Sequence, residues 1–265
     1  MQIREHSIPP PLRPYVRLIW SLEGDEAWNA AERIVPDCIA ELVFHWRTPF
    51  SIRFAGAQAE PQPRSFVLLQ TRRFVEIRPR GASGFVAVRF QPWGVCHFIP
   101  GSLAALADRQ VAAADLWGRE AELLEERLGS AERLHDRVRL VAGFLMSQLS
   151  RHQRSDRESL ARTVWRSRGT LAVRQLSRHT GLGERHLQRA FAADLGTSPK
   201  QFARISRFLH ACELLRSGRF ARLTDVAHAC GYYDQSHFNG DFRKLAGLTP
   251  GDFGRLDGIS FLEID

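Results

Sequence analysis

The sequence predicts an α+β protein: a small N-terminal β-barrel or β-sandwich with accompanying helices, then an all-α domain with two helix-turn-helix units. Short runs of β-branched, aromatic and alternating residues, separated by Pro, Gly, Asn and Asp, occupy residues 12–91. One helical pattern occurs twice within residues 171–254, at an offset of 50 to 51 residues. We therefore expect a β-rich domain, a linker, a double helix-turn-helix domain and a tail, at residues 1–150, 151–158, 159–257 and 258–265.

Six runs in the N-terminal half have strand character, and short strands at this spacing are typical of a small barrel or sandwich. They span residues 15–22, 39–46, 50–55, 65–70, 74–78 and 84–90. After Trp93 the pattern becomes helical, because apolar residues recur at three-to-four spacing. We expect these helices over residues 95–99, 102–106, 113–128 and 131–149.

The first copy of the repeat predicts a supporting helix over residues 172–180, a turn at Gly181 and a second helix over 184–194. Apolar residues four apart give the second helix one buried stripe, formed by Leu187, Phe191 and Leu195. Its opposite face carries Arg185, Gln188, Arg189 and Ala192. Arg and Gln side chains form bidentate hydrogen bonds with guanine and adenine, respectively, so this face is suited to reading DNA bases.

The second copy predicts a helix over residues 224–230 capped by Thr224, a turn, and a second helix over 235–245 capped by Asp234. Its outward face is expected to carry Gln235, Ser236, Asn239, Gly240 and Arg243. A glycine within a helix costs about 1 kcal/mol relative to alanine. Gly240 therefore indicates either a close approach of the backbone to DNA or a helix that reads fewer bases.

A long helix is expected between the two copies. Ser198 is its predicted N-cap, Pro199 takes the first helical position, and Gln201 is expected to complete a capping box. The helix should run to Ser217 and end at Gly218. Its length of about 28 Å would suit two recognition helices placed about one DNA turn (~34 Å) apart. A closing helix is expected to start at Thr249-Pro250 in the same way.

Charge and cysteine usage agree with an intracellular nucleic-acid partner. Residues 157–257 account for the whole net charge of +8, because they hold 17 Lys or Arg and 9 Asp or Glu. No apolar run approaches ~20 residues and no signal-peptide pattern is present, so we expect a cytoplasmic protein that does not enter a membrane. The cysteines are scattered and are expected to be reduced, buried thiols, at Cys38, Cys96, Cys212 and Cys230.

The C-terminal half resembles the DNA-binding domain of the AraC/XylS family of bacterial transcription regulators, over about residues 160–256. The resemblance rests on LQRAF at 187–191, GTSP at 196–199, ACELL at 211–215, DVA at 225–227, GY at 231–232, SHF at 236–238, FRK at 242–244 and GLTP at 247–250. It implies that two recognition helices, at about 184–195 and 235–246, enter successive major grooves of double-stranded DNA.

By the same resemblance, Arg185 and Arg189 read bases for the first helix, and Gln235, Ser236, Asn239 and Gly240 occupy the reading positions of the second. The family commonly has Arg at the place of Gly240. Together with the outward-facing Gln188 and Arg243, the expected DNA-binding residues are Arg185, Gln188, Arg189, Gln235, Ser236, Asn239 and Arg243.

The N-terminal half resembles, more loosely, the β-rich sensor half of some members of the family, through residues 10–20, 35–44 and 88–94. Such halves often bind a small effector, dimerise, or do both. RNA polymerase, a small effector and a second copy of the chain are therefore candidate partners. The sequence leaves open the operator, the effector and whether transcription rises or falls.

The sequence gives weaker support to several other functions. A β-barrel metalloenzyme would need clustered His and Glu ligands, whereas His45 and His97 stand alone. An alkyl-transfer or repair fusion would need an activated cysteine cluster, whereas Cys38 is isolated. Asp37 and Glu41 could form an acid pair but are more typical of caps and ion pairs. We therefore expect no catalytic residues, no metal and no cofactor; a nonspecific DNA-coating protein stays open because of Gly240.

Aromatic residues in the N-terminal half have two readings. They could line an effector pocket or belong to the core of the barrel or sandwich, and aromatic residues on strands usually do the latter. The residues concerned are Trp20, Trp46, Phe90 and Trp93.

Overall fold

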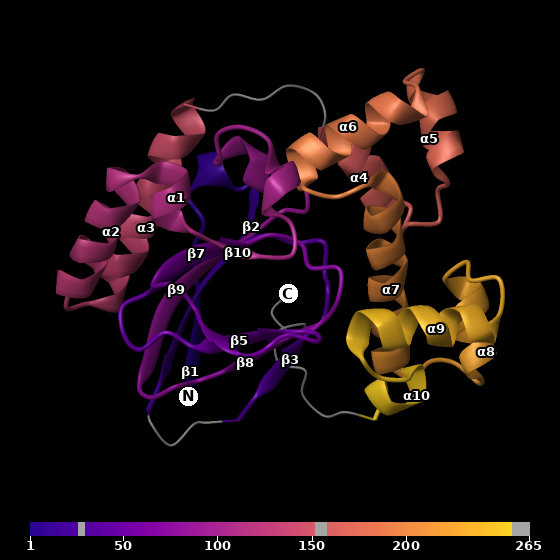
Figure 1. The fold of residues 1–265 in the computed structure, drawn as a ribbon, viewed down its shortest axis with the longest axis horizontal. Coiled ribbons are helices and arrows are strands. Elements are labelled where there is room, and N and C mark those ends of the chain that lie inside the picture. The colour runs from indigo at the N-terminus through magenta and orange to yellow at the C-terminus, as the bar shows by residue number, and fades with distance from the viewer. Residues whose placement is uncertain (26–29, 152–157, 256–265) are drawn as a thin grey trace.

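The computed structural model describes residues 1–25, 30–151 and 158–255, and it places a β-rich part beside a helical part (Figure 1). The described strands form two antiparallel sheets with the orders β1-β2-β9-β4-β7-β10 and β3-β8-β5-β6. The strands are β1 (Gln2–His6), β2 (Val16–Gly24), β3 (Glu32–Ile34), β4 (Glu41–His45), β5 (Ser51–Phe54), β6 (Glu60–Pro61), β7 (Ser65–Leu68), β8 (Val75–Arg78), β9 (Ser83–Phe90) and β10 (Gln110–Ala112). The described strands close no barrel, so of the two expected architectures the sandwich is the one observed.

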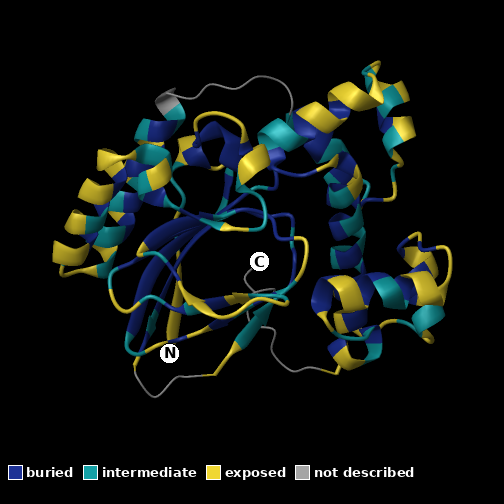
Figure 2. Cartoon of the chain, viewed as in Figure 1, coloured by how far each residue is buried: buried dark blue, intermediate teal, exposed yellow. Residues whose placement is uncertain are grey.

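Both faces of the interior strands of the six-stranded sheet are buried, whereas the edge strand β1 is largely exposed. On one face, Trp20, Phe50 and Phe85 pack in a cluster shared with the smaller sheet. On the other face, Phe44 and Val88 pack in a second cluster with residues of the helices that follow the strands. Because β9 lies in the interior of the sheet, all eight of its residues are buried rather than every second one (Figure 2).

Helices α1 (Ala113–Trp117), α2 (Arg119–Ser130) and α3 (Leu134–Arg151) lie together at the outer side of the β-rich part (Figure 1). The expectation of one helix over residues 113–128 is wrong, because Gly118 adopts φ 55° and separates α1 from α2. Three short 3₁₀ turns precede or accompany these elements, η1 (Pro10–Leu12), η2 (Val95–His97) and η3 (Leu103–Leu106).

The helical part consists of two similar units joined by one long helix. Its elements are α4 (Glu158–Arg166), α5 (Val173–Thr180), α6 (Glu184–Leu195), α7 (Pro199–Ser217), α8 (Leu223–Ala229), α9 (Gln235–Ala246) and α10 (Pro250–Phe253). One apolar cluster runs through all of them and includes the fully buried rings of Phe202, Phe208, Phe238 and Phe242. Val35 and Cys38 of the β-rich part belong to the same cluster. The two parts therefore share a core.

Two predictions about helix starts are wrong: the Thr224 cap of α8 and the capping box of α7. Helix α8 begins one residue before Thr224, and the backbone N–H of Arg222 donates to Asp225 Oδ2 at 2.8 Å, so an acidic side chain three residues on satisfies this end. At α7 the Ser198 hydroxyl accepts from the backbone N–H of Gln201 at 3.1 Å, as expected. Gln201 makes no return hydrogen bond among the described residues, and its Nε2 is buried without a partner. The predicted linker residues 152–157 and the tail 258–265 lie outside the described residues.

Candidate nucleic-acid interface

The first recognition helix, α6, has one buried and one exposed face. Leu187, Phe191 and Leu195 are at most 4% exposed, which confirms the predicted stripe. Arg185, Gln188 and Arg189 are all exposed on the other side. Gly181 has φ 70° and ends the supporting helix α5, as predicted. The polar face of α6 is therefore presented to solvent by the packing of its apolar face.

The second recognition helix, α9, repeats this arrangement. Phe238, Phe242 and Leu245 are fully buried. The Asp234 side chain accepts from the backbone N–H of His237 at 2.7 Å, which confirms the predicted N-cap. Four predicted DNA-binding residues lie on this helix. Three of them are exposed, Gln235, Ser236 and Arg243, whereas Asn239 is half-buried.

Helix α7 holds the two units against each other. Near its start, the ring of Phe202 lies 5.8 Å from that of Phe191 in α6. Further along, Arg204 donates from Nε to Asp241 of α9 at 3.0 Å, and its Nη2 lies 2.9 Å from the same oxygen. The Asp241 side chain is buried, so this charged contact is largely removed from water. The single helix of 19 residues thus fixes the separation of α6 and α9.

Both recognition helices end against the β-rich part, and the supporting helices α5 and α8 lie on the far side (Figure 1). Gly196 ends α6 with φ 67°, and a β-carbon there would lie 3.0 Å from the carbonyl oxygen of Leu103. Gly247 ends α9 with φ 70°, and a β-carbon there would overlap the ring of Phe74. The backbone N–H of Phe74 donates to the carbonyl of Leu245 at 2.8 Å. The β-rich part therefore contacts both recognition helices at their C-terminal ends.

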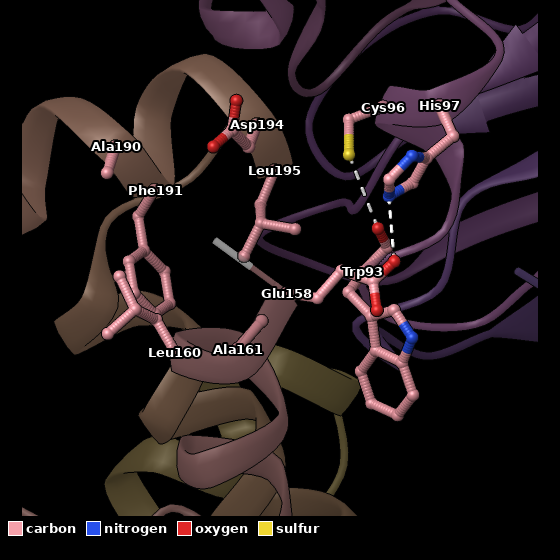
Figure 3. Close-up of a pocket in the computed structure, with 10 residues that line it drawn as sticks. All are labelled: Trp93, Cys96, His97, Glu158, Leu160, Ala161, Ala190, Phe191, Asp194 and Leu195. Carbon is pink, nitrogen blue, oxygen red and sulfur yellow. Dashed lines mark hydrogen bonds and ion pairs between the residues drawn. The ribbon is translucent and has the colours of Figure 1, made fainter. Parts of the chain in front are cut away.

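A third contact joins η2 to α4 beside a small pocket (Figure 3). His97 Nε2 lies 2.9 Å from Glu158 Oε1, and the imidazole is buried. Glu158 also pairs with Arg162 at 3.1 Å, whose guanidinium lies 4.6 Å from the Trp93 ring centre. The apolar walls of the pocket come from α4 and from the inner face of α6, through Leu160, Ala161, Ala190, Phe191 and Leu195.

Of the aromatic residues considered for an effector pocket, only Trp93 borders this one. Trp20 and Phe90 are buried in the clusters on either side of the six-stranded sheet. The half-buried Trp46 packs over Gly84 and under the guanidinium of Arg137, whose carbon lies 4.6 Å from the ring centre. Two of the four are thus core residues.

The structure adds one residue that the sequence analysis missed. Tyr233 lies in the turn before α9 and is 88% exposed. Among the described residues, it is the most exposed of the large hydrophobic side chains. The preceding residue, Tyr232, is buried against Phe238 with its ring centres 5.1 Å apart. Residue spacing does not distinguish the two tyrosines, but the resemblance to the AraC/XylS family, which commonly has Phe at the place of Tyr232, gives Tyr232 the packing role that it has in the structure.

The alternative chemistries gain no support from the described residues. No group of three or more His, Cys, Asp or Glu among them could hold a metal ion. Asp37 is engaged by Arg89 and by the backbone N–H of Ile39, and Glu41 accepts from Trp20 Nε1 at 3.0 Å. All four cysteines are buried and none forms a disulfide, which confirms that expectation. No helix in the described ranges is both long and apolar enough to cross a membrane.

Burial makes the thiols poor nucleophiles. It raises the pKa of Cys38 and of Cys212 well above their ordinary value, and it raises the pKa of Cys230 to about 11. An activated cysteine would require the opposite shift. Cys38 therefore acts as a packing residue rather than a nucleophile. Its Sγ donates a hydrogen bond to the carbonyl of Phe202 at 3.5 Å.

Comparison with known proteins matches the two parts separately. Residues 176–255 match a family described as a helix-turn-helix domain, and residues 4–112 match one described as a domain of unknown function, DUF6597. The chain is 39% identical over 72 residues to the HTH-type transcriptional activator RhaR of Yersinia pseudotuberculosis serotype O:1b (strain IP 31758), covering 27% of this chain and 24% of RhaR. It is 32% identical over 83 residues to the HTH-type transcriptional regulator GlxA of Rhizobium meliloti (strain 1021), covering 31% of this chain and 25% of GlxA.

The chain thus spans about a quarter of the length of these curated relatives. Among solved structures, ToxT from Vibrio cholerae aligns with a TM-score of 0.47 and 10% identity, over 85% of this chain and 97% of ToxT. ToxT of strain SCE256 with a bound unsaturated fatty acid aligns with a TM-score of 0.44 and 13% identity, over 89% of this chain and 93% of that one.

Proposed function

We propose, from the match of residues 176–255 to a helix-turn-helix family, that this protein is a sequence-specific DNA-binding regulator of transcription. The observation that carries the proposal is the pair of recognition helices, α6 and α9, each with a buried apolar stripe and an exposed polar face. Because one helix, α7, packs against both, the two polar faces are presented as a unit. Such a unit suits two successive major grooves on one side of DNA.

The base-reading role is assigned to seven side chains. On α6, the two arginines suit guanine and the glutamine suits adenine. On α9, the amides of Gln235 and Asn239 suit adenine, whereas Ser236 and Arg243 can contact bases or phosphates. The residues on α6 are Arg185, Gln188 and Arg189. We assign Tyr233 a phosphate contact, because its hydroxyl is carried on a largely solvent-exposed ring at the turn that enters α9.

The β-rich part is proposed as a sensor or dimerisation module rather than an enzyme. It touches the C-terminal ends of both recognition helices without covering their polar faces. A change in this part could therefore alter how the two helices are held while leaving their reading faces free. RNA polymerase, a small effector and a second copy of the chain are the partners that such a regulator would use.

Footprinting of the full chain on the DNA upstream of its own gene, at several salt concentrations, tests the proposal. We expect paired protected major grooves about one helical turn apart and a strong excess over random DNA. The number of such pairs would indicate whether one or two copies bind. Binding that is equal on all DNA and falls steeply with salt would instead identify a nonspecific DNA-coating protein.

A further inference from the structure

The β-rich part contains a cavity that faces the helical part. It opens to solvent, and about 40 Å³ within it is accessible to water, which is room for a few water molecules or a ligand of similar size. Six of its lining residues are aliphatic and come from residues 34–39, 68–69 and 75. Its polar lining consists of Asp37, Glu41, Thr71 and Arg89. An apolar chamber with a few convergent polar groups is the usual composition of a ligand site.

The charges in this cavity do not balance. Arg89 lies on β9, is 7% exposed and pairs with Asp37. Glu41 at the start of β4 faces the same guanidinium and accepts a hydrogen bond from Trp20 Nε1. Two carboxyl groups thus share one cation. Burial raises the pKa of Glu41, which is the expected response of a carboxyl group whose charge is incompletely compensated.

The cavity walls are also the segments that contact the helical part. Leu69 lies 3.2 Å from the position of a β-carbon on Gly196, at the end of α6. Phe74, one residue before the lining residue Val75, contacts Gly247 and Leu245 at the end of α9. One short segment, residues 69–75, therefore lies between the cavity and both recognition helices.

A second wall reaches α7. Asp37 points into the cavity, and the next residue, Cys38, is buried against the carbonyl of Phe202. Cys38 has φ 59°, a left-handed conformation that is costly for a residue with a β-carbon. Non-glycine residues in this conformation persist where the surroundings over-determine them, and they cluster at ligand clamps and switches. The strained backbone turns adjacent side chains toward the cavity and toward the helical core.

We propose that this cavity binds a small primary ammonium compound with an apolar body, whose ammonium group pairs with Glu41, and that its occupancy alters the contacts of residues 69–75 with α6 and α9. The ammonium supplies the second cation that the three ionisable groups lack. The aliphatic walls take the apolar body. Binding to the cavity stands independently of DNA recognition, whereas its consequence for gene regulation rests on the proposed function.

The probe is n-butylamine, compared with n-butanol and butyrate of the same chain length at the same ionic strength. Binding to the full chain at pH 7.5 is measured by saturation-transfer NMR and by the rise in melting temperature, which reports ligand binding to the folded state. We expect saturable binding of the amine, at least tenfold tighter than that of the alcohol, and no saturable binding of butyrate. Equal binding of amine and alcohol, or preferential binding of butyrate, would overturn the proposal.

Glu41→Gln removes the charge while keeping an acceptor for Trp20, and Glu132→Gln, at an exposed position on the same part of the chain, is the matched control. We expect the first to weaken amine binding at least tenfold and the second to leave it unchanged. Unchanged amine binding by a folded Glu41→Gln protein would contradict the assignment. If that variant does not fold, the preference of the wild type for amine over alcohol still decides the question.

Hydrogen exchange of the wild type tests the coupling without DNA. The backbone N–H of Phe74 is protected by its bond to Leu245, so the peptide covering residues 69–75 reports this contact directly. We expect saturating amine to change its exchange at least threefold and butyrate to leave it unchanged. An unaltered exchange in the amine-bound protein would refute the coupling. Footprinting with and without amine then separates failure of the coupling from failure to bind DNA.

Discussion

Gly196 and Gly247 occupy equivalent positions in the two repeats, and both are pressed against the β-rich part. Each ends a recognition helix in the left-handed conformation. The carbonyl of Leu103 stands over the first, and the ring of Phe74 stands over the second. Arg33 also reaches the end of α9 and donates to the carbonyl of Ala246 at 3.3 Å. Because both helices contact the β-rich part at their C-terminal glycines, a shift of the β-rich part acts on the two helices together.

Gly247→Ala should destabilise the chain more than Gly181→Ala. Both glycines have φ 70°, so both substitutions carry the left-handed cost of roughly 1–2 kcal/mol. Only at Gly247 would the added methyl group also overlap Phe74, since nothing lies within 4 Å at Gly181. Urea denaturation of the full chain measures both. Equal losses would show that the contact with Phe74 yields without cost.

Gly240→Ala should stabilise the protein and leave DNA binding intact. Gly240 lies within α9, and nothing lies within 4 Å of an added β-carbon. The expected gain is about 1 kcal/mol from helix propensity, and Gly143→Ala in α3 should give a similar gain. Thermal denaturation and DNA binding are measured for both. Weaker DNA binding by Gly240→Ala alone would instead indicate close approach of the backbone to DNA.

Arg189→Ala should lower affinity for the specific site by about 1–3 kcal/mol and relax base preference locally. Its side chain is exposed on the outer face of α6. Arg139→Ala removes the same charge from an exposed position on α3 and serves as the control. Quantitative binding to operator variants compares them. A uniform loss across all sequences would assign Arg189 to phosphate contact.

Stability should fall on acidification through the protonation of His45 in the unfolded chain. Burial among Phe50, Phe66 and Phe85 lowers the pKa of His45 from 6.5 to about 4. Between these values the unfolded chain binds a proton that the folded chain does not, so the free energy of unfolding decreases as pH falls, by about 3 kcal/mol in total. His45→Gln should flatten this part of the pH profile, whereas His135→Gln, at an exposed position, should not. Identical profiles for wild type and His45→Gln would contradict it.

Asp241→Asn should separate the contribution of charge between α7 and α9. The variant keeps an acceptor for Arg204 but removes the negative charge from a contact in which Asp241 is 7% exposed. We expect a loss of about 2 kcal/mol, as is typical for hydrogen bonds to charged groups. Urea denaturation measures it, with the exposed Asp225→Asn as a comparison for a cap. A loss below that of the cap would show that the buried charge contributes little.

The recognition helices could be predicted because their signals are local. Leu187, Phe191 and Leu195 recur at helical spacing, and Ser198 and Asp234 begin helices with side chains that accept backbone N–H groups. Local signals failed where long-range pairing decides. Strand β1 is almost wholly exposed, shows no apolar alternation and is held by pairing with β2. β3 and β10 are three-residue strands that were missed for the same reason.

The candidate sites show the same division. The outward faces of α6 and α9 follow from residue spacing within each helix. The contact of Gly247 with Phe74 joins residues more than 170 positions apart, and nothing near either residue signals it. Asp37 and Glu41 lie close in sequence, but their partner Arg89 is distant along the chain. It lies on β9, which pairs directly with β4 and places Arg89 opposite Glu41, so only the folded sheet reveals the shared guanidinium.

The sharing of Val35 and Cys38 with the helical core limits how this protein can be recombined. A hybrid joining the β-rich part to the helical half of a relative would place these two side chains against a foreign α7. Cys38 needs a carbonyl and a hydroxyl at the positions of Phe202 and Ser206, from which its Sγ lies 3.5 and 3.9 Å. A chimera of this kind would therefore fold only if residues 35–38 were taken from the same protein as the helices that they contact.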